Sequence, residues 1–177
     1  MNAEKKILFE TERLILRPLT QNDLLPLNEI LTDPQTMQYY PRPWDKTEVE
    51  DWINRNIKSY KEQGYGMWAV ILKETDRFIG ECGITDQNID YEAVVEIGYH
   101  IHKSFWNKGY GTEAAQGCLE FGFHSLGMNE IYIHCAVKNT PSYRVAEKLG
   151  MHKVKEYDKR CRGSNIPVPH VVYKIKK

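Results

Sequence analysis

Three features of the sequence predict a mixed α/β (α+β) fold. A strand-like run at 94–101 passes through a glycine-containing loop into a helix-like segment at 115–126. Two apolar runs, 67–72 and 78–84, are joined by a short polar turn, as in a hairpin. Strand-like and helix-like segments then alternate to the end of the chain. Because 177 residues suit one domain with a real core, we expect a single domain over 1–177.

Each element has its own signal in the spacing of apolar residues. Alternation predicts strands at 12–19, 67–72, 78–84, 94–101, 131–137, 153–157 and 171–175. Spacings of three and four residues predict helices through 24–31, 49–60, 115–126 and 140–150.

Polar residues indicate where three of these helices begin. Thr20 and Asp23 can act as a capping pair for the first helix, and Thr47 with Glu50 makes a capping box for the second. Thr140 suits the N-cap of the last helix, because Pro141 then takes the first helical position.

The junction at 105–115 is the strongest candidate for a binding site. A strand, a glycine-containing loop and a helix follow one another, and such a junction presents unpaired N–H groups at the positive end of a helix dipole. Gly109 and Gly111 allow close backbone approach, and Lys108 can add a charged contact. The junction therefore suits a phosphate or pyrophosphate, although a tight strand-to-helix turn explains the same glycines.

Composition excludes several classes of protein. Acidic and basic side chains number 24 each, so no basic field indicates nucleic acid. No apolar run approaches the length of a membrane span, and the N-terminus is charged rather than signal-like. The four cysteines are widely spaced, which predicts reduced thiols in a cytoplasmic protein. No ligand spacing around His100 and His102 indicates a metal.

The segment from Glu81 to Glu96 is acidic and contains no Lys or Arg. Its acids are Glu81, Asp86, Asp90, Glu92 and Glu96. A solvated hairpin loop is one interpretation, and a surface that attracts a cationic substrate is the other.

Glu96 is the first candidate for a general base. Strand alternation places Glu96, Gly98 and His100 on one face, with Ile97 and Tyr99 on the opposite face. A carboxylate in an otherwise apolar strand indicates either a salt bridge or a catalytic group. His100 and Glu81 are weaker candidates.

Three segments together resemble the GNAT superfamily of acyl-CoA N-acyltransferases. The first is Lys108-Gly109-Tyr110-Gly111-Thr112-Glu113-Ala114, and the second runs from Asn139 through Ser142 to Glu147-Lys148-Leu149-Gly150. The third, Thr11-Glu12-Arg13-Leu14-Ile15-Leu16-Arg17-Pro18-Leu19, is similar to the start of the RimJ/RimL-like branch, which acetylates ribosomal-protein N-termini. The matches extend over nearly the full chain.

The resemblance implies a fold and a cofactor. The fold is a mixed, mostly antiparallel sheet of six or seven strands, flanked by about four helices, in which strands 94–101 and 131–137 splay apart. The co-substrate is acetyl-CoA, with no metal. The pyrophosphate would lie on backbone amides of 107–112, and the pantetheine arm would pair with Tyr99 to Ile101. The implied cofactor-binding residues are Tyr99, Ile101, Asn107, Lys108, Gly109, Tyr110, Gly111, Thr112, Asn139 and Ser142.

The sequence departs from the family pattern at three positions. Trp106 stands where many members have Gln or Arg, although Trp is common there in the RimJ/RimL-like branch. Ala146 replaces a tyrosine that donates a proton to the leaving thiolate, which leaves that role to another group. Pro169 replaces an Asp before the last strand.

The implied activity is acetyl transfer from acetyl-CoA to a primary amine, by direct attack on the thioester. Ser142, at a helix start, can stabilise or protonate the thiolate, or simply serve as a capping residue; Glu96 can remove the amine proton. A peptide α-amine has a pKa near ~8, so about a tenth is neutral at pH 7, and it needs little help from a base.

Three functions remain open. The aromatic loop at 39–44 suits a protein or peptide N-terminus, whereas the acidic segment suits an aminoglycoside, a polyamine or an amino acid. A non-catalytic acyl-CoA-binding module is the third. The chain is either a monomer or a homodimer.

Overall fold

The computed structural model describes residues 7–177, and in this part of the chain one eight-stranded sheet carries four α-helices. The mixed α/β class is confirmed, with one strand more than the predicted maximum of seven. That extra strand has two residues, too few to produce an alternation pattern. The predicted charged N-terminus concerns residues 1–6, which lie outside the described residues.

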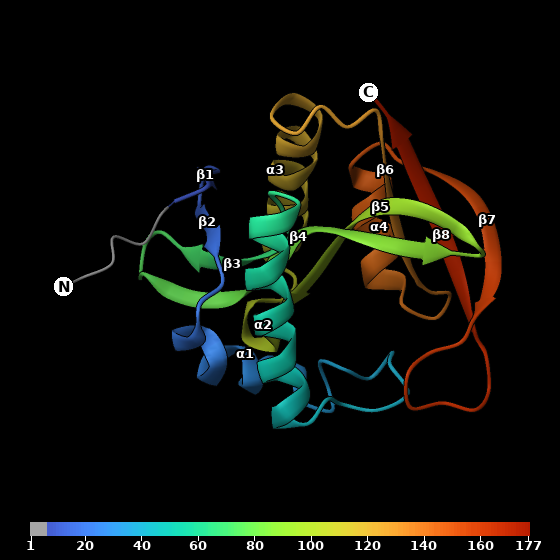
Figure 1. Ribbon diagram of the computed structural model, residues 1–177, viewed down its shortest axis with the longest axis horizontal. Coiled ribbons are helices and arrows are strands. Elements are labelled where there is room, and N and C mark those ends of the chain that lie inside the picture. The colour runs from blue at the N-terminus through green and yellow to red at the C-terminus, as the bar shows by residue number, and fades with distance from the viewer. Residues whose placement is uncertain (1–6) are drawn as a thin grey trace.

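The sheet has the order β1-β2-β3-β4-β5-β6-β8-β7 (Figure 1). Every pair of neighbouring strands is antiparallel except β5 and β6, which are parallel. The strands are β1 Phe9–Glu10, β2 Leu14–Pro18, β3 Met67–Leu72, β4 Arg77–Ile89, β5 Glu92–Ile101, β6 Glu130–Ala136, β7 His152–Lys159 and β8 Val168–Lys176.

The helices lie on both faces of the sheet. They are α1 Leu24–Leu31, α2 Lys46–Glu62, α3 Tyr110–His124 and α4 Thr140–Lys148, with short 3₁₀ turns at Gln21–Asp23 and Lys103–Phe105. One hydrophobic cluster joins α1 and α2 to one face, and a larger cluster joins α3 and α4 to the other. Figure 1 shows α2 in front of β3 and β4.

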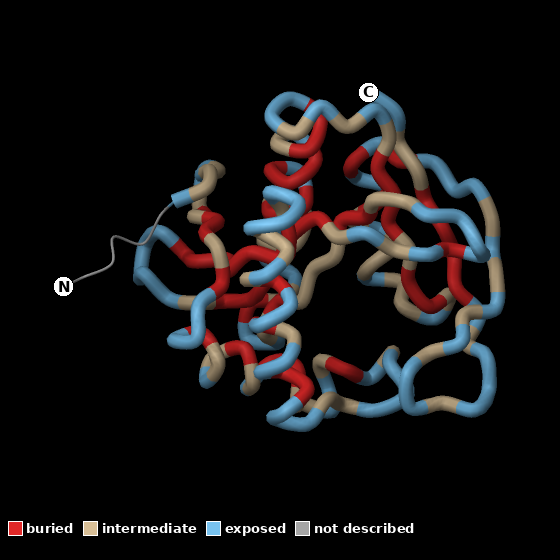
Figure 2. The backbone as a smooth tube through the Cα atoms, viewed as in Figure 1, coloured by how far each residue is buried: buried red, intermediate tan, exposed pale blue. Residues whose placement is uncertain are grey.

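Strand β3 shows how the sequence produces this layering. Trp68 and Val70 pack in the α3–α4 cluster, whereas Ala69 and Ile71 pack in the α1–α2 cluster. All six residues of β3 are buried, since helices cover both faces, and the strand accordingly reads as a continuous apolar run. Figure 2 shows that buried residues follow the central strands, while the loop between β7 and β8 is largely exposed and the loop before α2 mixes exposed with partly buried residues.

The helix starts agree with the sequence in one case and differ in two. Thr20 and Asp23 form the predicted capping box. The predicted box of Thr47 and Glu50 is wrong: the box of α2 is Asp45 with Glu48, two positions earlier. Asp45 is the N-cap because its carboxylate accepts a hydrogen bond from the N–H of Glu48, while the carboxylate of Glu48 accepts one from the N–H of Asp45.

The predicted N-cap of α4, Thr140, is also wrong. Asn139 is the N-cap, and its Oδ1 accepts a hydrogen bond of 3.2 Å from the N–H of Ser142. Thr140 and Pro141 therefore occupy the first turn of the helix, where a missing proline N–H is tolerated.

The acidic segment between Glu81 and Glu96 is not a solvated loop. It belongs to the long hairpin β4–β5, in which Glu81 pairs with His100 and Thr85 with Glu96. Glu81 and Glu96 are buried. The loop interpretation fails for these two because strand pairing turns their side chains towards one covered face.

Strands β5 and β6 separate beyond a single pairing position, Glu96 opposite Tyr132, in the described chain. Strand β5 continues to Ile101 against β4, and β6 continues to Ala136 against β8. The predicted splayed pair of central strands is therefore confirmed.

Candidate active site

The glycine loop at the start of α3 has the geometry of an anion-binding junction. Asn107 and Gly109 adopt positive φ angles of 60° and 83°. Gly109 is the N-cap, and no side chain caps the helix. The amides of Tyr110, Gly111 and Thr112 in the first turn thus remain available at the positive end of the helix dipole.

Residues far away in the sequence hold this loop. Glu113 accepts hydrogen bonds from the Nε of Arg13 at 2.6 Å, from the N–H of Arg13 at 2.8 Å and from the hydroxyl of Thr11 at 2.6 Å. Arg13 also donates to the carbonyl oxygen of Lys108 at 3.0 Å, and its guanidinium lies 4.5 Å from the ring centre of Tyr110. The loop is therefore tied to the turn before β2.

Burial alone would raise the pKa of Glu113, but the hydrogen bonds from Thr11 and Arg13 bring it below the ordinary value. Glu113 is consequently an anion at neutral pH and remains a strong acceptor for Arg13.

Tyr99 and Ser142 meet on the α3–α4 face of the gap between β5 and β6. The Tyr99 hydroxyl donates to the carbonyl oxygen of Ser142 at 2.7 Å and lies 3.0 Å from its hydroxyl oxygen. Burial raises the pKa of Tyr99, so its hydroxyl stays protonated as a donor. Two hydroxyl groups therefore lie together at the N-terminus of α4, where the helix dipole favours negative charge.

Two other predicted cofactor residues have partners of their own. The carbonyl oxygen of Ile101 accepts from the indole Nε1 of Trp106 at 2.6 Å, so a pantetheine amide would share this oxygen. The Oδ1 of Asn139 caps α4, which leaves its amide N–H groups as donors.

Glu96 lies on the opposite face of the sheet and contacts a histidine. Its Oε2 is hydrogen-bonded to Nδ1 of His134 from β6, and the Nε2 of His134 lies 2.7 Å from Nζ of Lys159 from β7. The side chains of Glu96 and His134 are only 10% and 4% exposed. Glu96 is thus engaged in a hydrogen-bonded network with His134 and Lys159, and the same arrangement holds its carboxylate beside the gap.

A second carboxylate–histidine pair lies on the same face. Glu81 accepts from Nε1 of Trp52 at 3.0 Å and lies 2.9 Å from Nδ1 of His100, whose Nε2 lies 2.8 Å from the hydroxyl of Tyr40. Gly98 lies between His100 and Glu96 on this face. The two pairs therefore flank a stretch of strand without a side chain.

Tyr40, which contacts His100, also lines a cavity of about 380 Å³. Its walls come from the loop before α2, from the end of β6 and from the start of β8. The lining residues are Gln38, Tyr39, Tyr40, Pro41, Ala136, Val137, Lys138, Pro167, Val168 and Pro169. The aromatic loop at 39–44 and Pro169, which stands where many family members have an Asp, therefore both line this cavity. Its walls are mostly apolar.

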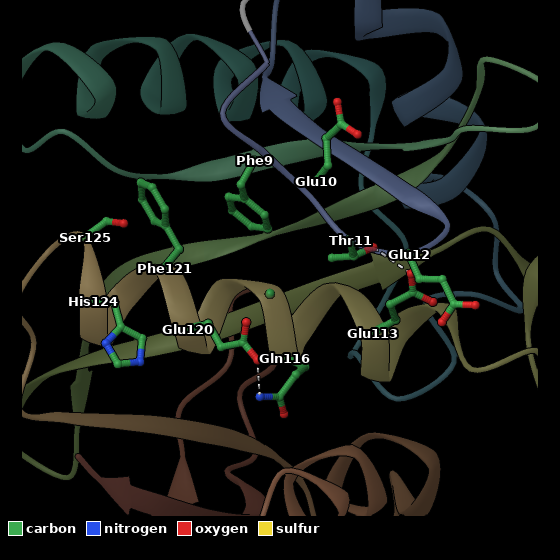
Figure 3. A pocket seen from close by; sticks show the side chains of 11 residues that line it. Phe9, Glu10, Thr11, Glu12, Glu113, Gln116, Glu120, Phe121, His124 and Ser125 are labelled. Carbon is green, nitrogen blue, oxygen red and sulfur yellow. Dashed lines mark hydrogen bonds between the residues drawn. The ribbon is translucent and has the colours of Figure 1, made fainter.

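A larger groove of about 540 Å³ lies elsewhere, between β1 and α3 (Figure 3). Figure 3 shows Phe9 and Phe121 at its floor, and these rings stack at 5.3 Å. The groove shares only Thr11 and Glu113 with the network that holds the glycine loop. It contains none of the predicted site residues.

The structure brings the predicted site residues to the two sides of one gap. The glycine loop, Tyr99 and Ser142 lie on the α3–α4 side, and Glu96 lies on the other. The sequence did not indicate His134, Lys159 or the hydroxyl role of Tyr99, and it indicated Tyr40 only as part of the aromatic loop at 39–44. Strand alternation was the available signal for Tyr99, since it places that side chain on the face covered by α4.

No helix within residues 7–177 is long and apolar enough to cross a membrane. In the same part of the chain, no cluster of three or more His, Cys, Asp or Glu side chains could hold a metal ion.

The sequence model of the family described as "Acetyltransferase (GNAT) domain" matches residues 13–152. The chain therefore belongs to the GNAT family and is an N-acetyltransferase of that type. It is 37% identical over 169 residues to the uncharacterized protein YkkB of Bacillus subtilis (strain 168), with 95% of each chain covered. The GNAT-family acetyltransferase from Bacillus anthracis superposes with a TM-score of 0.80 at 28% identity, covering 94% of this chain and 96% of that one.

Two more distant proteins have titles that name an acceptor. A structure of RimL, a ribosomal alpha-N-protein acetyltransferase in complex with coenzyme A, has a TM-score of 0.78 at 18% identity, covering 97% of this chain and 98% of that one. This likeness shows the fold alone. The spermidine N(1)-acetyltransferase of Vibrio cholerae (serotype O1, strain ATCC 39315 / El Tor Inaba N16961) is 24% identical over 151 residues, covering 82% of this chain and 84% of that one.

Proposed function

We propose that this protein transfers an acetyl group from acetyl-CoA to the N-terminal α-amine of a protein or peptide, as the RimJ/RimL-like branch does. The observation that carries the proposal is the gap between β5 and β6, with two hydroxyl groups on one side and a carboxylate on the other. A thioester placed in this gap would have its sulfur near Ser142 and Tyr99 and its open face towards Glu96.

The glycine loop would bind the pyrophosphate of acetyl-CoA. Amides of 107–112 and the side chain of Lys108 supply hydrogen bonds and positive charge at the start of α3. Tyr99 and Ile101 supply backbone groups for the pantetheine arm, much as a peptide adds to the edge of a sheet. Asn139 supplies amide donors beside them.

The protons of the reaction pass between the chain's own groups and solvent. Glu96 takes a proton from the amine as its nitrogen forms a bond to the carbonyl carbon. Ser142 donates a hydrogen bond to the sulfur as the carbon–sulfur bond breaks, while Tyr99, whose single proton is donated to the carbonyl oxygen of Ser142, holds Ser142 in place, and a proton from solvent neutralises the thiolate. A backbone N–H of Ile97 or Tyr99 in the gap would stabilise the negative charge on the carbonyl oxygen.

The charges around the cavity favour a peptide over a polyamine. Lys138 lines the cavity, and the Glu96–His134–Lys159 network supplies a cation as well as an anion. The exposed acids Asp90 and Glu92 pair with Lys155. They lie at the other end of β5 and β6, because these strands run parallel and the cavity lies beyond Ala136. A polycation therefore meets no row of free carboxylates in the cavity.

A small amine remains the second candidate, since a cavity of about 380 Å³ has the size of small-molecule sites. Release of free thiol from acetyl-CoA, measured with short peptides, polyamines, amino acids and aminoglycosides, tests both. Turnover of peptides with a small first residue supports the proposal. Preferential turnover of spermidine or an aminoglycoside would reject the peptide assignment, and no turnover with any amine would favour a binding module.

We further propose that the whole chain, 1–177, works as one domain in the cytoplasm. The family match ends at residue 152, but β8 pairs with β6 inside the sheet, so the last strands complete the same fold. All four cysteines are free, as expected in a reducing compartment.

A further inference from the structure

Three side chains from three strands lie in a row beside the gap. Glu96 comes from β5, His134 from β6 and Lys159 from β7. Strand β8 lies between β6 and β7 in the sheet, so the Lys159 side chain reaches across β8 to the imidazole. We propose that Lys159 is a positioning residue, which acts through His134 to keep Glu96 an anion with one oxygen open to the amine.

This inference rests on the proposed function, in which Glu96 is the base. It gives roles to His134 and Lys159 and places a proton on Nδ1 of His134, neither of which follows from Glu96 being the base.

The hydrogen-bond donors and acceptors around the imidazole fix the tautomer of His134. A lysine ammonium has three donors and no lone pair, so the Nε2 of His134 must accept from Lys159. The single proton of the neutral imidazole then lies on Nδ1 and is donated to Oε2 of Glu96. A second proton on Nε2 would place a cation against the ammonium and remove the acceptor.

The same hydrogen bonds exclude His134 as the base. Its Nδ1 already carries a proton, and its Nε2 is occupied by Lys159. The proton of an incoming amine therefore goes to the second oxygen of Glu96, Oε1, or to a water molecule that this oxygen binds.

Among the described residues, Lys159 is the cation in hydrogen-bond contact with the Glu96–His134 pair. Other titratable groups lie around the trio, namely Tyr40, Glu81, His100, Tyr157, Cys161 and His170, with Cys135 on the opposite face of β6. Burial lowers the pKa of His170 to about 4 and raises the pKa of Tyr157 and of Cys161. These three groups are therefore neutral at neutral pH and do not replace the charge of Lys159.

The test compares Lys159→Met, Lys159→Arg and the parent enzyme by kcat/KM against pH, with a peptide amine as acceptor. Without the ammonium, the Glu96–His134 pair loses the cation that favours the carboxylate anion. The acid limb should therefore move upwards, so the point where log kcat/KM steepens should rise by about one pH unit, a roughly tenfold loss near pH 6. Lys159→Arg should restore the parent profile.

Lys155→Met is the matched control. It removes the same side chain from the same strand, but Lys155 pairs with Asp90 and Glu92 at 3.2 and 3.3 Å. Its profile should coincide with that of the parent. A Lys159→Met profile parallel to the parent at every pH would overturn the proposal, because a purely structural role lowers activity without moving the limb.

A second measurement does not depend on turnover or on the Lys159 variants. Long-range ¹H–¹⁵N NMR of the parent near pH 7.5 reports the tautomer of His134, assigned by the loss of its signals in His134→Asn. The expected pattern is a neutral ring protonated on Nδ1. A proton on Nε2 would refute the inference even in an active enzyme, whereas the expected pattern in an inactive protein would place the failure in the proposed function.

Discussion

Glu113, in the first turn of α3, accepts hydrogen bonds from both the main-chain N–H and the side-chain Nε of Arg13, a residue one hundred positions earlier. The two residues belong to two of the three segments by which the sequence resembles its family. The structure shows that these segments form one unit, because Arg13 also holds the carbonyl oxygen of Lys108 in the glycine loop.

Glu113→Gln should weaken acetyl-CoA binding several-fold without unfolding the protein. The amide keeps the size of the side chain but loses the ion pair with Arg13. That ion pair holds the glycine loop in place and so orients the amides in the first turn of α3. Because Arg13 is 41% exposed, the pair contributes little to stability. Calorimetric titration with acetyl-CoA and a thermal melt measure the two effects.

Glu120→Gln is the control, since Glu120 lies two turns further along α3 and bonds to Gln116. Equal acetyl-CoA affinity in Glu113→Gln and the parent would show that the loop does not need this support.

Gly111→Val should reduce acetyl-CoA affinity by at least tenfold in a folded protein. A Cβ at this position would meet Ile101 Cγ1 at 3.7 Å, an ordinary contact, so the fold accepts the side chain. The added bulk then stands where, in the proposed function, the backbone approaches the pyrophosphate. Unchanged affinity by calorimetry would place the pyrophosphate elsewhere.

Gly109→Ala gives a contrasting result. Gly109 has a φ of 83°, and a side chain there is strained, so this variant should lose about 1 kcal/mol of stability or more. The pair of variants separates an effect on the loop conformation from an effect on ligand contact.

The fold was predictable because its signals are local. The continuous apolar run at 67–72 reflects burial on both faces of the sheet, and the helical spacing of 115–126 reflects packing of one helix face against the sheet. The predicted boundaries erred where two polar residues competed to cap a helix. Asp45 replaced Thr47, and Asn139 replaced Thr140, because the cap depends on how the preceding loop enters the helix.

The candidate site was predictable only in part. The glycine loop, Ser142 and Glu96 each lie inside a short pattern that the sequence displays. His134 and Lys159 have no such pattern, since their meeting depends on β8 being inserted between β6 and β7 in the sheet. Sequence separation of 25 residues between them conveys nothing about that order.

The free energy of unfolding should fall between pH 6.5 and pH 4 because of His170. Burial lowers the pKa of His170 to about 4, whereas an unfolded histidine has a pKa of about 6.5. The unfolded state therefore binds the proton first as pH falls, and stability present above about pH 6.5 is lost progressively towards pH 4, by on the order of 3 kcal/mol. Urea unfolding at several pH values measures the slope.

His170→Asn should flatten this slope, whereas His152→Asn, at an exposed position of β7, should leave it unchanged. Burial alone would raise the pKa of Asp23, but hydrogen bonds from Arg17 and Thr20 bring it below its ordinary value. Asp23 therefore stabilises the fold until it is protonated, which happens at a lower pH than the range in which His170 acts. Identical slopes in the parent and His170→Asn would assign the acid sensitivity to other groups.

Blocking the α-amine of a peptide acceptor should abolish turnover even when the peptide contains lysine. A lysine amine is less than about 0.1% neutral at pH 7, while an α-amine is neutral to about a tenth, and the cavity offers no row of carboxylates for a long cation. Thiol release with matched free and N-acetylated peptides measures this. Equal turnover of the two peptides would favour side-chain amines.

Ser142→Ala and Glu96→Gln should differ in their pH dependence, because the two residues are proposed to serve different steps. Ser142→Ala removes the hydroxyl proposed to donate to the sulfur, so kcat should fall by roughly one to three decades. The deficit should be similar at each pH. Glu96→Gln keeps an acceptor for His134 but removes the base, so its deficit should be largest at low pH, where the amine is charged. That deficit should shrink as the pH passes the pKa of the amine. Profiles of kcat/KM for both variants and the parent decide the matter: a Glu96→Gln deficit that stays constant across the range would leave Glu96 as a charge that binds the acceptor or holds the sheet.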